Sequence, residues 1–342
     1  MHRLSDFDYE LPSDQIAQHP LSDRSASRLL VLDRGSSETR HLHFRDLAGL
    51  IPAGDGLVLN TSRVIPARLH GKRETGNAAE LLMVRALADG TWLAMGHPGG
   101  KLKPGRRITF GDDSAVEILE VLGGGLRRLR FVGALDAGAT LAKYGAVPLP
   151  PYIRRAPDAA DTERYQTVYA AHDGSVAAPT AGLHFTPELL ADLYTRGVRV
   201  ASLDLHVGPG TFKPVETEDL AQHPMHAEAF EITPGAAQII NRAKEKGRGV
   251  WAVGTTVVRA LESSVEANGS VRAGAGETAL FIRPPFDFKI VNHLITNFHL
   301  PRSTLLMLVC AFGGYEPVMN AYREAVQEGY RFYSYGDAML LL

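Results

Sequence analysis

The chain has 342 residues, of which 45% are hydrophobic and 22% are charged; this composition is typical of a globular protein and excludes a disordered or fibrous one. Its length predicts two domains, or one domain with a large insertion. Lys and Arg number 36 against 38 Asp and Glu, a formal net charge of -2. This balance excludes a global positive field for nucleic acid and allows only a local one.

The single cysteine, Cys310, excludes an internal disulfide framework and a four-cysteine zinc site, and it favours a reducing compartment. It lies in the apolar run L-L-M-L-V-C-A-F, residues 305–312, which predicts core packing and is too short to span a bilayer. The N-terminal residues show no apolar signal-peptide core. We therefore expect a cytoplasmic protein with no membrane association.

In chain order, the first sixty residues contain L-V-L-D and G-L-V-L-N, which could be strands of a sheet completed later in the chain. From about residue 61 to 135, short β-like runs such as A-E-L-L-M-V-R-A alternate with turn signals such as H-P-G-G. This spacing is typical of a small barrel or sandwich. We predict an inserted β-barrel domain over residues 61–165 and a main domain formed by residues 1–60 and 166–342.

After about residue 175, helix signals alternate with apolar segments. Thr-Pro pairs at 186–187 and 233–234 combine an N-cap with a proline at the first helical position. Each predicted helix leads into a strand-like run, V-R-V-A-S-L-D-L or G-V-W-A-V-G, which is the alternation of a βαβ sheet. The predicted fold class is therefore α/β, with a mixed sheet-and-helix main domain and a small β-barrel inserted in it.

Four loops that follow predicted strands carry polar residues. They are P-T-A-G-L-H-F-T with His184, H-V-G-P-G-T-F with His206, G-T-T-V-V-R with Thr255, Thr256 and Arg259, and T-N-F-H-L-P-R-S-T with Asn297 and His299. Right-handed crossovers keep parallel strands pointing the same way, and ligands of open α/β sheets bind beyond the carboxyl ends, so we expect these loops to surround a ligand. Taken singly, His184 could be a satisfied core histidine, and His206 could simply bond to Asp204.

The segment G-T-T-V-V-R places backbone N–H groups and two hydroxyls at a predicted helix N-terminus, with Arg259 about one turn further on. Helix N-termini attract compact anions, which suits a carboxylate or a phosphate. Ordinary capping by the two threonines is the alternative.

Two further patterns concern metals and RNA. His223, His226 and Glu228 in H-P-M-H-A-E match no zinc spacing, so we predict no metal and prefer acid-base or hydrogen-bonding roles. Between residues 61 and 130, 12 Lys or Arg stand against 7 Asp or Glu. This excess fits a solvated surface or an RNA contact in the β-rich block.

Long ordered motifs give the chain a resemblance to a known family. They include D-F-D-Y-E-L-P, N-T-S-R-V-I-P-A-R-L, V-A-A-P-T-A-G-L-H-F, L-H-V-G-P-G-T-F-K-P-V and T-N-F-H-L-P-R-S-T-L-L-M-L-V, and they extend over nearly the whole chain. On these motifs the chain resembles the S-adenosylmethionine:tRNA ribosyltransferase-isomerase family of queuosine biosynthesis. Pro209 stands where we expect alanine in this family.

The resemblance implies that the ribosyl part of S-adenosylmethionine is transferred to the aminomethyl group of a 7-aminomethyl-7-deazaguanine at the tRNA wobble position. The products would be epoxyqueuosine tRNA, adenine and methionine. Proton transfers are required, and histidine titrates near working pH. We therefore expect His184 and His206 to carry these steps, with Glu228 paired to one of them or to a ribose hydroxyl. S-adenosylmethionine would be a substrate, and the protein a monomer.

The same resemblance suggests substrate contacts. Thr255, Thr256 and Arg259 would hold the methionine carboxylate. The remaining expected contacts are Asn297 and His299 with the adenine or deazaguanine edge, Asp337 with the sulfonium or the aminomethyl cation, and Arg63 and Arg68 with RNA phosphates.

Two other classes of protein remain open. One is another enzyme that acts on a nucleotide or sugar at a sheet edge, such as a metal-assisted hydrolase that uses His223, His226 and Glu228. The other is a non-catalytic RNA-binding protein that uses the basic β-rich block. Activity in the presence of a chelator would count against the first, and release of free adenine would exclude the second.

Overall fold

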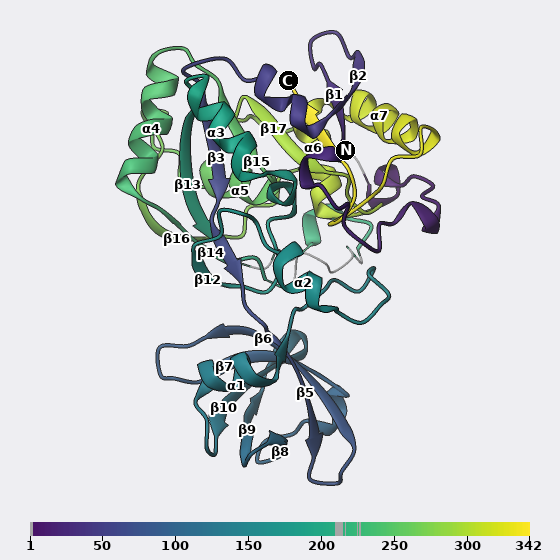
Figure 1. Ribbon diagram of the computed structural model, residues 1–342, viewed down its shortest axis with the longest axis vertical. Coiled ribbons are helices and arrows are strands. Elements are labelled where there is room, and N and C mark those ends of the chain that lie inside the picture. The colour runs from purple at the N-terminus through teal and green to yellow at the C-terminus, as the bar shows by residue number, and fades with distance from the viewer. Residues whose placement is uncertain (1–2, 209–214, 216, 224, 226) are drawn as a thin grey trace.

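The computed structural model describes residues 3–208, 215, 217–223, 225 and 227–342, and it contains two lobes (Figure 1). The larger lobe holds a nine-stranded sheet, and the smaller one, below it in the view, holds a seven-stranded sheet. Pro209 and His226, which were singled out from the sequence, lie outside the described residues. Within the described part of the chain, no helix has the length and apolar character needed to cross a membrane.

The nine-stranded sheet is mixed and has the order β16-β14-β13-β3-β15-β17-β18-β1-β2. Its four central neighbours β13, β3, β15 and β17 are mutually parallel, so their carboxyl ends share one edge. The strands are β1 Arg28–Leu32, β2 Thr39–His43, β3 Gly56–Asn60, β13 Arg199–Leu205, β14 Glu228–Ile232, β15 Val250–Val253, β16 Gly274–Thr278, β17 His293–Asn297 and β18 Ala338–Leu341. Strands β3 and β15 are buried throughout, which fits their largely apolar sequences.

Helices cover both faces of this sheet. One hydrophobic cluster joins it to α4, α5, α6 and α7, and a second joins it to α3 and the short helices η4 and η7. The helices of the larger lobe are α2 Ala159–Arg164, α3 Pro187–Thr195, α4 Pro234–Glu245, α5 Thr255–Glu262, α6 Thr304–Gly313 and α7 Tyr315–Gln327. Both predicted Thr-Pro starts are confirmed: Thr186 accepts from the N–H of Leu189, and Thr233 from that of Ala236. Cys310 is buried in α6, as expected.

Short 3-10 helices connect many of these elements. They are η1 Leu4–Phe7, η2 Ser13–Gln15, η3 Arg24–Ala26, η4 Phe44–Gly49, η5 Gly99–Lys101, η6 Gly123–Gly125, η7 Thr180–His184 and η9 Leu220–Gln222.

The smaller lobe is formed by antiparallel strands in the order β11-β5-β6-β7-β10-β9-β8. Strand β5 also pairs with β8, so the two ends of this order are brought together around one hydrophobic cluster. The elements are β5 Arg68–Arg73, β6 Ala78–Ala86, β7 Trp92–His97, β8 Arg107–Gly111, β9 Ser114–Val121, β10 Leu126–Val132, α1 Ala137–Tyr144 and β11 Gly145–Ala146. The mixed α/β class with a β-rich insertion is thus observed, while closure into a barrel stays a prediction.

Two connections join the lobes. Strand β4, Ser62–Val64, leads into the smaller lobe and pairs in parallel with β12, His172–Ser175. On the return path, Leu149 and Ile153 are buried in a cluster with Tyr165 and Tyr335. The chain after about residue 148 therefore packs against the larger lobe.

Candidate active site

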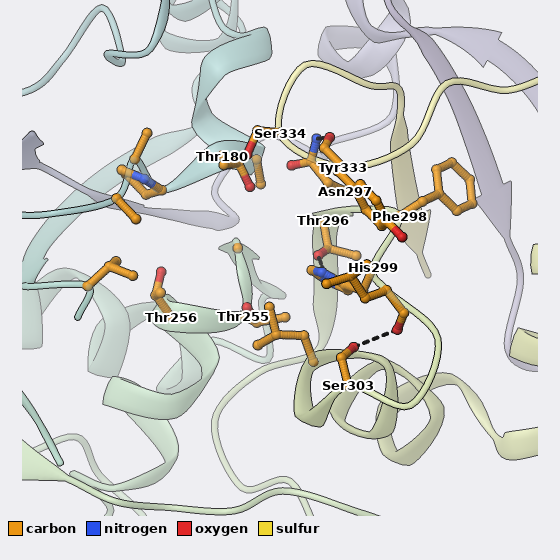
Figure 2. A pocket seen from close by; sticks show the side chains of 18 of the residues that line it. Thr180, Thr255, Thr256, Thr296, Asn297, Phe298, His299, Ser303, Tyr333 and Ser334 are labelled. Carbon is orange, nitrogen blue, oxygen red and sulfur yellow. Dashed lines mark hydrogen bonds between the residues drawn. The ribbon is translucent and has the colours of Figure 1, made fainter. Parts of the chain in front are cut away.

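A pocket lies at the carboxyl edge of the four parallel strands (Figure 2). Thr180 comes from the loop after β12, Val207 from the loop after β13, Thr255 from the start of α5 and Asn297 from the end of β17. All four loops selected from the sequence therefore reach this pocket. Its volume of about 70 Å³ suits a compact part of a ligand.

Helix α5 presents its N-terminus to the pocket. Gly254, with a φ of 95°, lets the chain turn sharply from β15 into the helix. No side chain of the described residues caps this helix start. The Thr256 hydroxyl is buried and has no hydrogen-bond partner among the described residues. Because helix N-termini carry free N–H groups and partial positive charge, this side of the pocket suits an anion.

Arg259 lies elsewhere than expected. Its guanidinium forms a buried ion pair with Glu228, and it donates from Nε to the Leu280 carbonyl (3.2 Å) and from Nη2 to the Thr278 carbonyl (3.1 Å). Glu228 in turn accepts from the N–H of Gly208 at 3.0 Å. These bonds tie α5 to the β14–β16 edge of the sheet, and Arg259 does not line the pocket. These contacts hold α5 in place, and carboxylate binding by Arg259 stays an untested prediction.

His184 also differs from the expectation. Its ring is buried and stacked on Phe44, with 4.9 Å between ring centroids. Nε2 accepts from Asn297 Nδ2 at 3.1 Å, so the proton lies on Nδ1 and is donated to Ser27 Oγ at 2.9 Å. Burial lowers the pKa of His184 to about 3. The ring lies behind Asn297 and outside the pocket lining, so the structure favours the core-histidine alternative over a proton-transfer role.

Asn297 provides the polar group opposite α5 (Figure 2). Its Nδ2 donates both to His184 and to the Tyr333 carbonyl, at 3.0 Å in the second case, which fixes the orientation of the amide. Its Oδ1 is buried and has no partner among the described residues. The amide therefore offers an oriented acceptor in the pocket wall, where a ligand N–H or ammonium could bind.

His299 lines the pocket beside Asn297. Its Nε2 lies 2.8 Å from Thr296 Oγ1, and burial lowers the pKa of its imidazole to about 3. The Tyr9 hydroxyl donates to the His299 carbonyl at 2.5 Å, and the His299 N–H donates to the Tyr322 hydroxyl at 3.1 Å. The imidazole is therefore neutral. The two backbone hydrogen bonds fix the position of the residue.

The two buried histidines predict how stability varies with pH. The folded-state pKa of each lies below the ordinary 6.5, so the unfolded chain takes up protons first as pH falls. Between pH 6.5 and about 3 each histidine should lower the free energy of unfolding by about 1.4 kcal/mol per pH unit. Urea unfolding at pH 7.5, 6 and 5 checks this slope. His184→Gln should flatten it, and an unchanged slope in that variant would contradict the assignment.

His206 is separated from the pocket and faces a second cavity between the lobes. Its Nδ1 is buried and has no partner among the described residues. The expected alternative, a bond to Asp204, is not observed; Asp204 instead accepts from Thr61 Oγ1 at 2.8 Å and pairs with His172 at 2.7 Å. A Cβ on Gly174 would come within 2.6 Å of His206 Nδ1, so glycine is required there. Of the two histidines expected to transfer protons, His184 has a partner at both ring nitrogens, whereas His206 Nδ1 has none among the described residues.

The remaining expected contacts are distributed as follows. Arg63 is exposed at the junction of the lobes, with Nε 3.5 Å from Asp173. Arg68 is committed to Glu80 at 2.6 Å and to the Leu149 carbonyl at 3.0 Å. Arg63 Nη2 also donates to the Ala170 carbonyl at 2.8 Å. An RNA phosphate could reach Arg63 more easily than Arg68, because of these two only Arg63 is exposed and its ion pair is a weak surface one.

Asp337 lies outside the pocket. Its carboxylate accepts the N–H groups of Arg28 at 2.9 Å and of Arg331 at 2.8 Å, and burial raises its pKa. It thereby joins the start of β1 to the loop before β18. This position supports a structural role and not the expected contact with a substrate cation.

Sequence reasoning did not identify several residues that line the pocket, among them Tyr152, Tyr333 and Ser334. The Tyr152 hydroxyl lies 2.6 Å from Ser334 Oγ, so the segment returning from the smaller lobe forms part of the pocket wall. Tyr333 has a φ of 69°, which is uncommon for a bulky residue. The motifs P-L-P-P-Y-I and Y-S-Y-G-D were visible signals, but neither follows a strand of the predicted βαβ pattern.

The described residues contain no group of three or more His, Cys, Asp or Glu side chains placed to hold a metal ion. Of the three residues considered for a metal, Glu228 is paired with Arg259 and His223 packs edge-on against Phe281, with 5.5 Å between ring centroids. His226 lies outside the described part of the chain.

Comparisons with known proteins identify the family. Residues 4–341 match the model of the queuosine biosynthesis protein family. A protein of Heliobacterium modesticaldum is 50% identical over 98% of both chains, and one of an Anaeromyxobacter species is 54% identical over 99% of both; each is named S-adenosylmethionine:tRNA ribosyltransferase-isomerase. The crystal structure of an S-adenosylmethionine tRNA ribosyltransferase from Thermotoga maritima is also similar, with 38% identity, a TM-score of 0.57 and coverage of 98% of this chain and 100% of that one.

The chain therefore belongs to the queuosine biosynthesis protein family. The family resemblance read from the sequence motifs is confirmed, and so is the enzyme class that it implied.

Proposed function

We propose that this protein transfers and isomerises the ribosyl moiety of S-adenosylmethionine onto 7-aminomethyl-7-deazaguanine at the tRNA wobble position, with epoxyqueuosine tRNA, adenine and methionine as products. The observation that carries the proposal is the pocket at the sheet edge, where the α5 N-terminus faces the oriented Oδ1 of Asn297. An anion site opposite a hydrogen-bond acceptor matches the carboxylate and ammonium of a methionine group. The names of the full-length relatives support the same reaction.

In this proposal, the methionine arm of S-adenosylmethionine enters the narrow pocket. The N–H groups at the start of α5 and the Thr256 hydroxyl bind its carboxylate, and Asn297 Oδ1 accepts from its ammonium. The sulfonium and the ribosyl group then lie toward Val207, which lines both this pocket and the cavity between the lobes.

His206 is the residue that we propose for proton transfer, because it lines the cavity between the lobes and its buried Nδ1 has no hydrogen-bond partner among the described residues. His184 acts as a positioning residue for Asn297. Glu228 and Arg259 form the support that holds α5 against the sheet. His299 contributes a neutral polar wall to the pocket.

We further propose a cytoplasmic monomer whose lobes divide the chain near residues 61 and 148, the second boundary lying earlier than the sequence-based estimate of 165. The contacts of Leu149 and Ile153 with the larger lobe support this shift. The smaller lobe would be a closed β-barrel, which the β5–β8 pairing supports.

Incubation with S-adenosylmethionine and an anticodon stem-loop RNA tests the reaction. The RNA carries the 7-aminomethyl-7-deazaguanine base, and both adenine release and RNA mass are followed. Adenine release together with an RNA mass gain that matches the transferred ribosyl unit is the expected result. A gain of one methyl group, or no reaction by folded protein, would overturn the proposed function, and reaction without adenine release would require another mechanism.

A further inference from the structure

A cavity of about 660 Å³ lies between the lobes and is much larger than the pocket at the sheet edge. Its wall on the side of the smaller lobe is largely apolar and includes Trp92, Leu93, Met95 and Leu126. The wall on the side of the larger lobe carries His206 and Glu228. An apolar wall facing a few polar groups is the usual composition of a site for a flat heterocyclic ligand.

Trp92 supplies an aromatic surface in this cavity. It begins β7, is half-buried and touches Phe131 edge-on, with 6.0 Å between ring centroids and an interplanar angle of 79°. Single-stranded nucleic acids commonly bind by stacking their bases on such side chains. The indole therefore offers a stacking surface on the wall opposite His206.

The polar wall contains a histidine, His206, one of whose ring nitrogens has no hydrogen-bond partner among the described residues. His206 Nδ1 is buried, and no described residue satisfies it. Gly174 packs so closely on the ring that a side chain there would displace it. A buried polar atom with no partner is costly in a protein unless a ligand or a water satisfies it. The close packing of Gly174 therefore fixes the orientation of the His206 ring, although no described residue forms a hydrogen bond with Nδ1.

Two exposed ion pairs border the cavity, each through one residue of its lining, Arg85 or Asp173. Arg85 of the smaller lobe lies 3.4 Å from Glu277 of the larger lobe, and Arg63 lies 3.5 Å from Asp173. Exposed pairs of this kind contribute little stability. Their arginines can therefore exchange a carboxylate for an RNA phosphate at low cost.

We propose that the cavity between the lobes binds the acceptor as a purine-type base turned out of an RNA loop, stacked on Trp92 and hydrogen-bonded to His206. Val207 lines both the cavity and the pocket, so the base would lie directly beside the ribosyl donor. This inference rests on the proposed function, and it adds the place and the manner of acceptor binding. Enzymes that modify a base commonly take it out of the stack in this way.

Tryptophan fluorescence tests the site without turnover. The chain has two tryptophans, and Trp251 is 1% exposed with Nε1 bonded to Asp55 at 2.8 Å, so a ligand in the cavity can contact only Trp92. A stem-loop RNA with a purine at the acceptor position should quench the emission of Trp92. The same RNA with an abasic acceptor position should not, and Trp92→Phe should abolish the change while Trp251→Phe keeps it. Equal quenching by both RNAs, or by S-adenosylmethionine alone, would overturn the proposal.

Steady-state kinetics provide the second test. Trp92→Leu should raise KM for the RNA by about 10-fold or more, because base stacking is worth that much, with KM for S-adenosylmethionine unchanged. Trp92→Phe should recover most of the loss. An unchanged KM for the RNA in Trp92→Leu would contradict acceptor stacking, even if the wild type releases adenine. If the wild type shows purine-dependent quenching but releases no adenine, the proposed reaction fails while the base site stands.

Discussion

Arg259→Ala should lower the free energy of unfolding by about 3–5 kcal/mol, because it removes the guanidinium of a buried ion pair with Glu228. The substitution also removes the donors to the Thr278 and Leu280 carbonyls, which hold the β16 edge against α5. Urea unfolding measures the change. The size of the effect follows from burial: the side chains of Arg259 and Glu228 are 6% and 5% exposed.

A double variant, Arg259→Met with Glu228→Gln, serves as the matched control. It removes both charges and keeps similar volumes, so it should recover a large part of the lost stability. If Arg259→Ala unfolds like the wild type and instead loses affinity for S-adenosylmethionine, the guanidinium binds the ligand after all. The role inferred from its contacts would then be wrong.

Asn297→Leu should reduce kcat/KM for S-adenosylmethionine by about 10- to 100-fold, since it removes an oriented acceptor from the pocket and a charged partner makes such a bond strong. The loss should appear mainly in KM, because the amide is proposed to bind the ground-state ammonium. Initial rates at varied S-adenosylmethionine concentrations measure it.

The pair His184→Gln and His184→Phe separates positioning from proton transfer. Gln can accept from Asn297 Nδ2 in place of the imidazole, so its activity should stay within about 10-fold of the wild type. Phe has no acceptor and should resemble Asn297→Leu. Loss of activity in both variants to the same extent, with a changed pH profile in His184→Gln, would restore His184 as an acid or base.

The sequence predicts the positions of residues that depend on neighbouring residues in the chain, such as strand ends and helix starts. Thr255 lies just after β15 and Asn297 ends β17. Because parallel strands bring their carboxyl ends to one edge, the meeting of these two residues could be inferred. The Thr-Pro pairs predicted two helix starts for the same reason, because capping depends on residues that are neighbours in the chain.

The roles of His184 and Arg259 could not be predicted in this way. Their partners Ser27 and Glu228 are distant in sequence, and no local pattern shows which polar groups will be buried together. The cavity between the lobes could not be predicted from the sequence for a similar reason. It depends on how the β-rich insertion is placed against the larger lobe, whereas turn spacing indicates only the strands of the insertion.

The most direct test of this account is calorimetric titration of S-adenosylmethionine into the wild type and Thr256→Val. The central claim is that the α5 N-terminus and the Thr256 hydroxyl bind the methionine carboxylate. The variant removes one donor to a charged group, so its Kd should rise about 10-fold. Thr195→Val, at an exposed position in α3, is the matched control and should bind like the wild type. Equal Kd values for the wild type and Thr256→Val would contradict the claim.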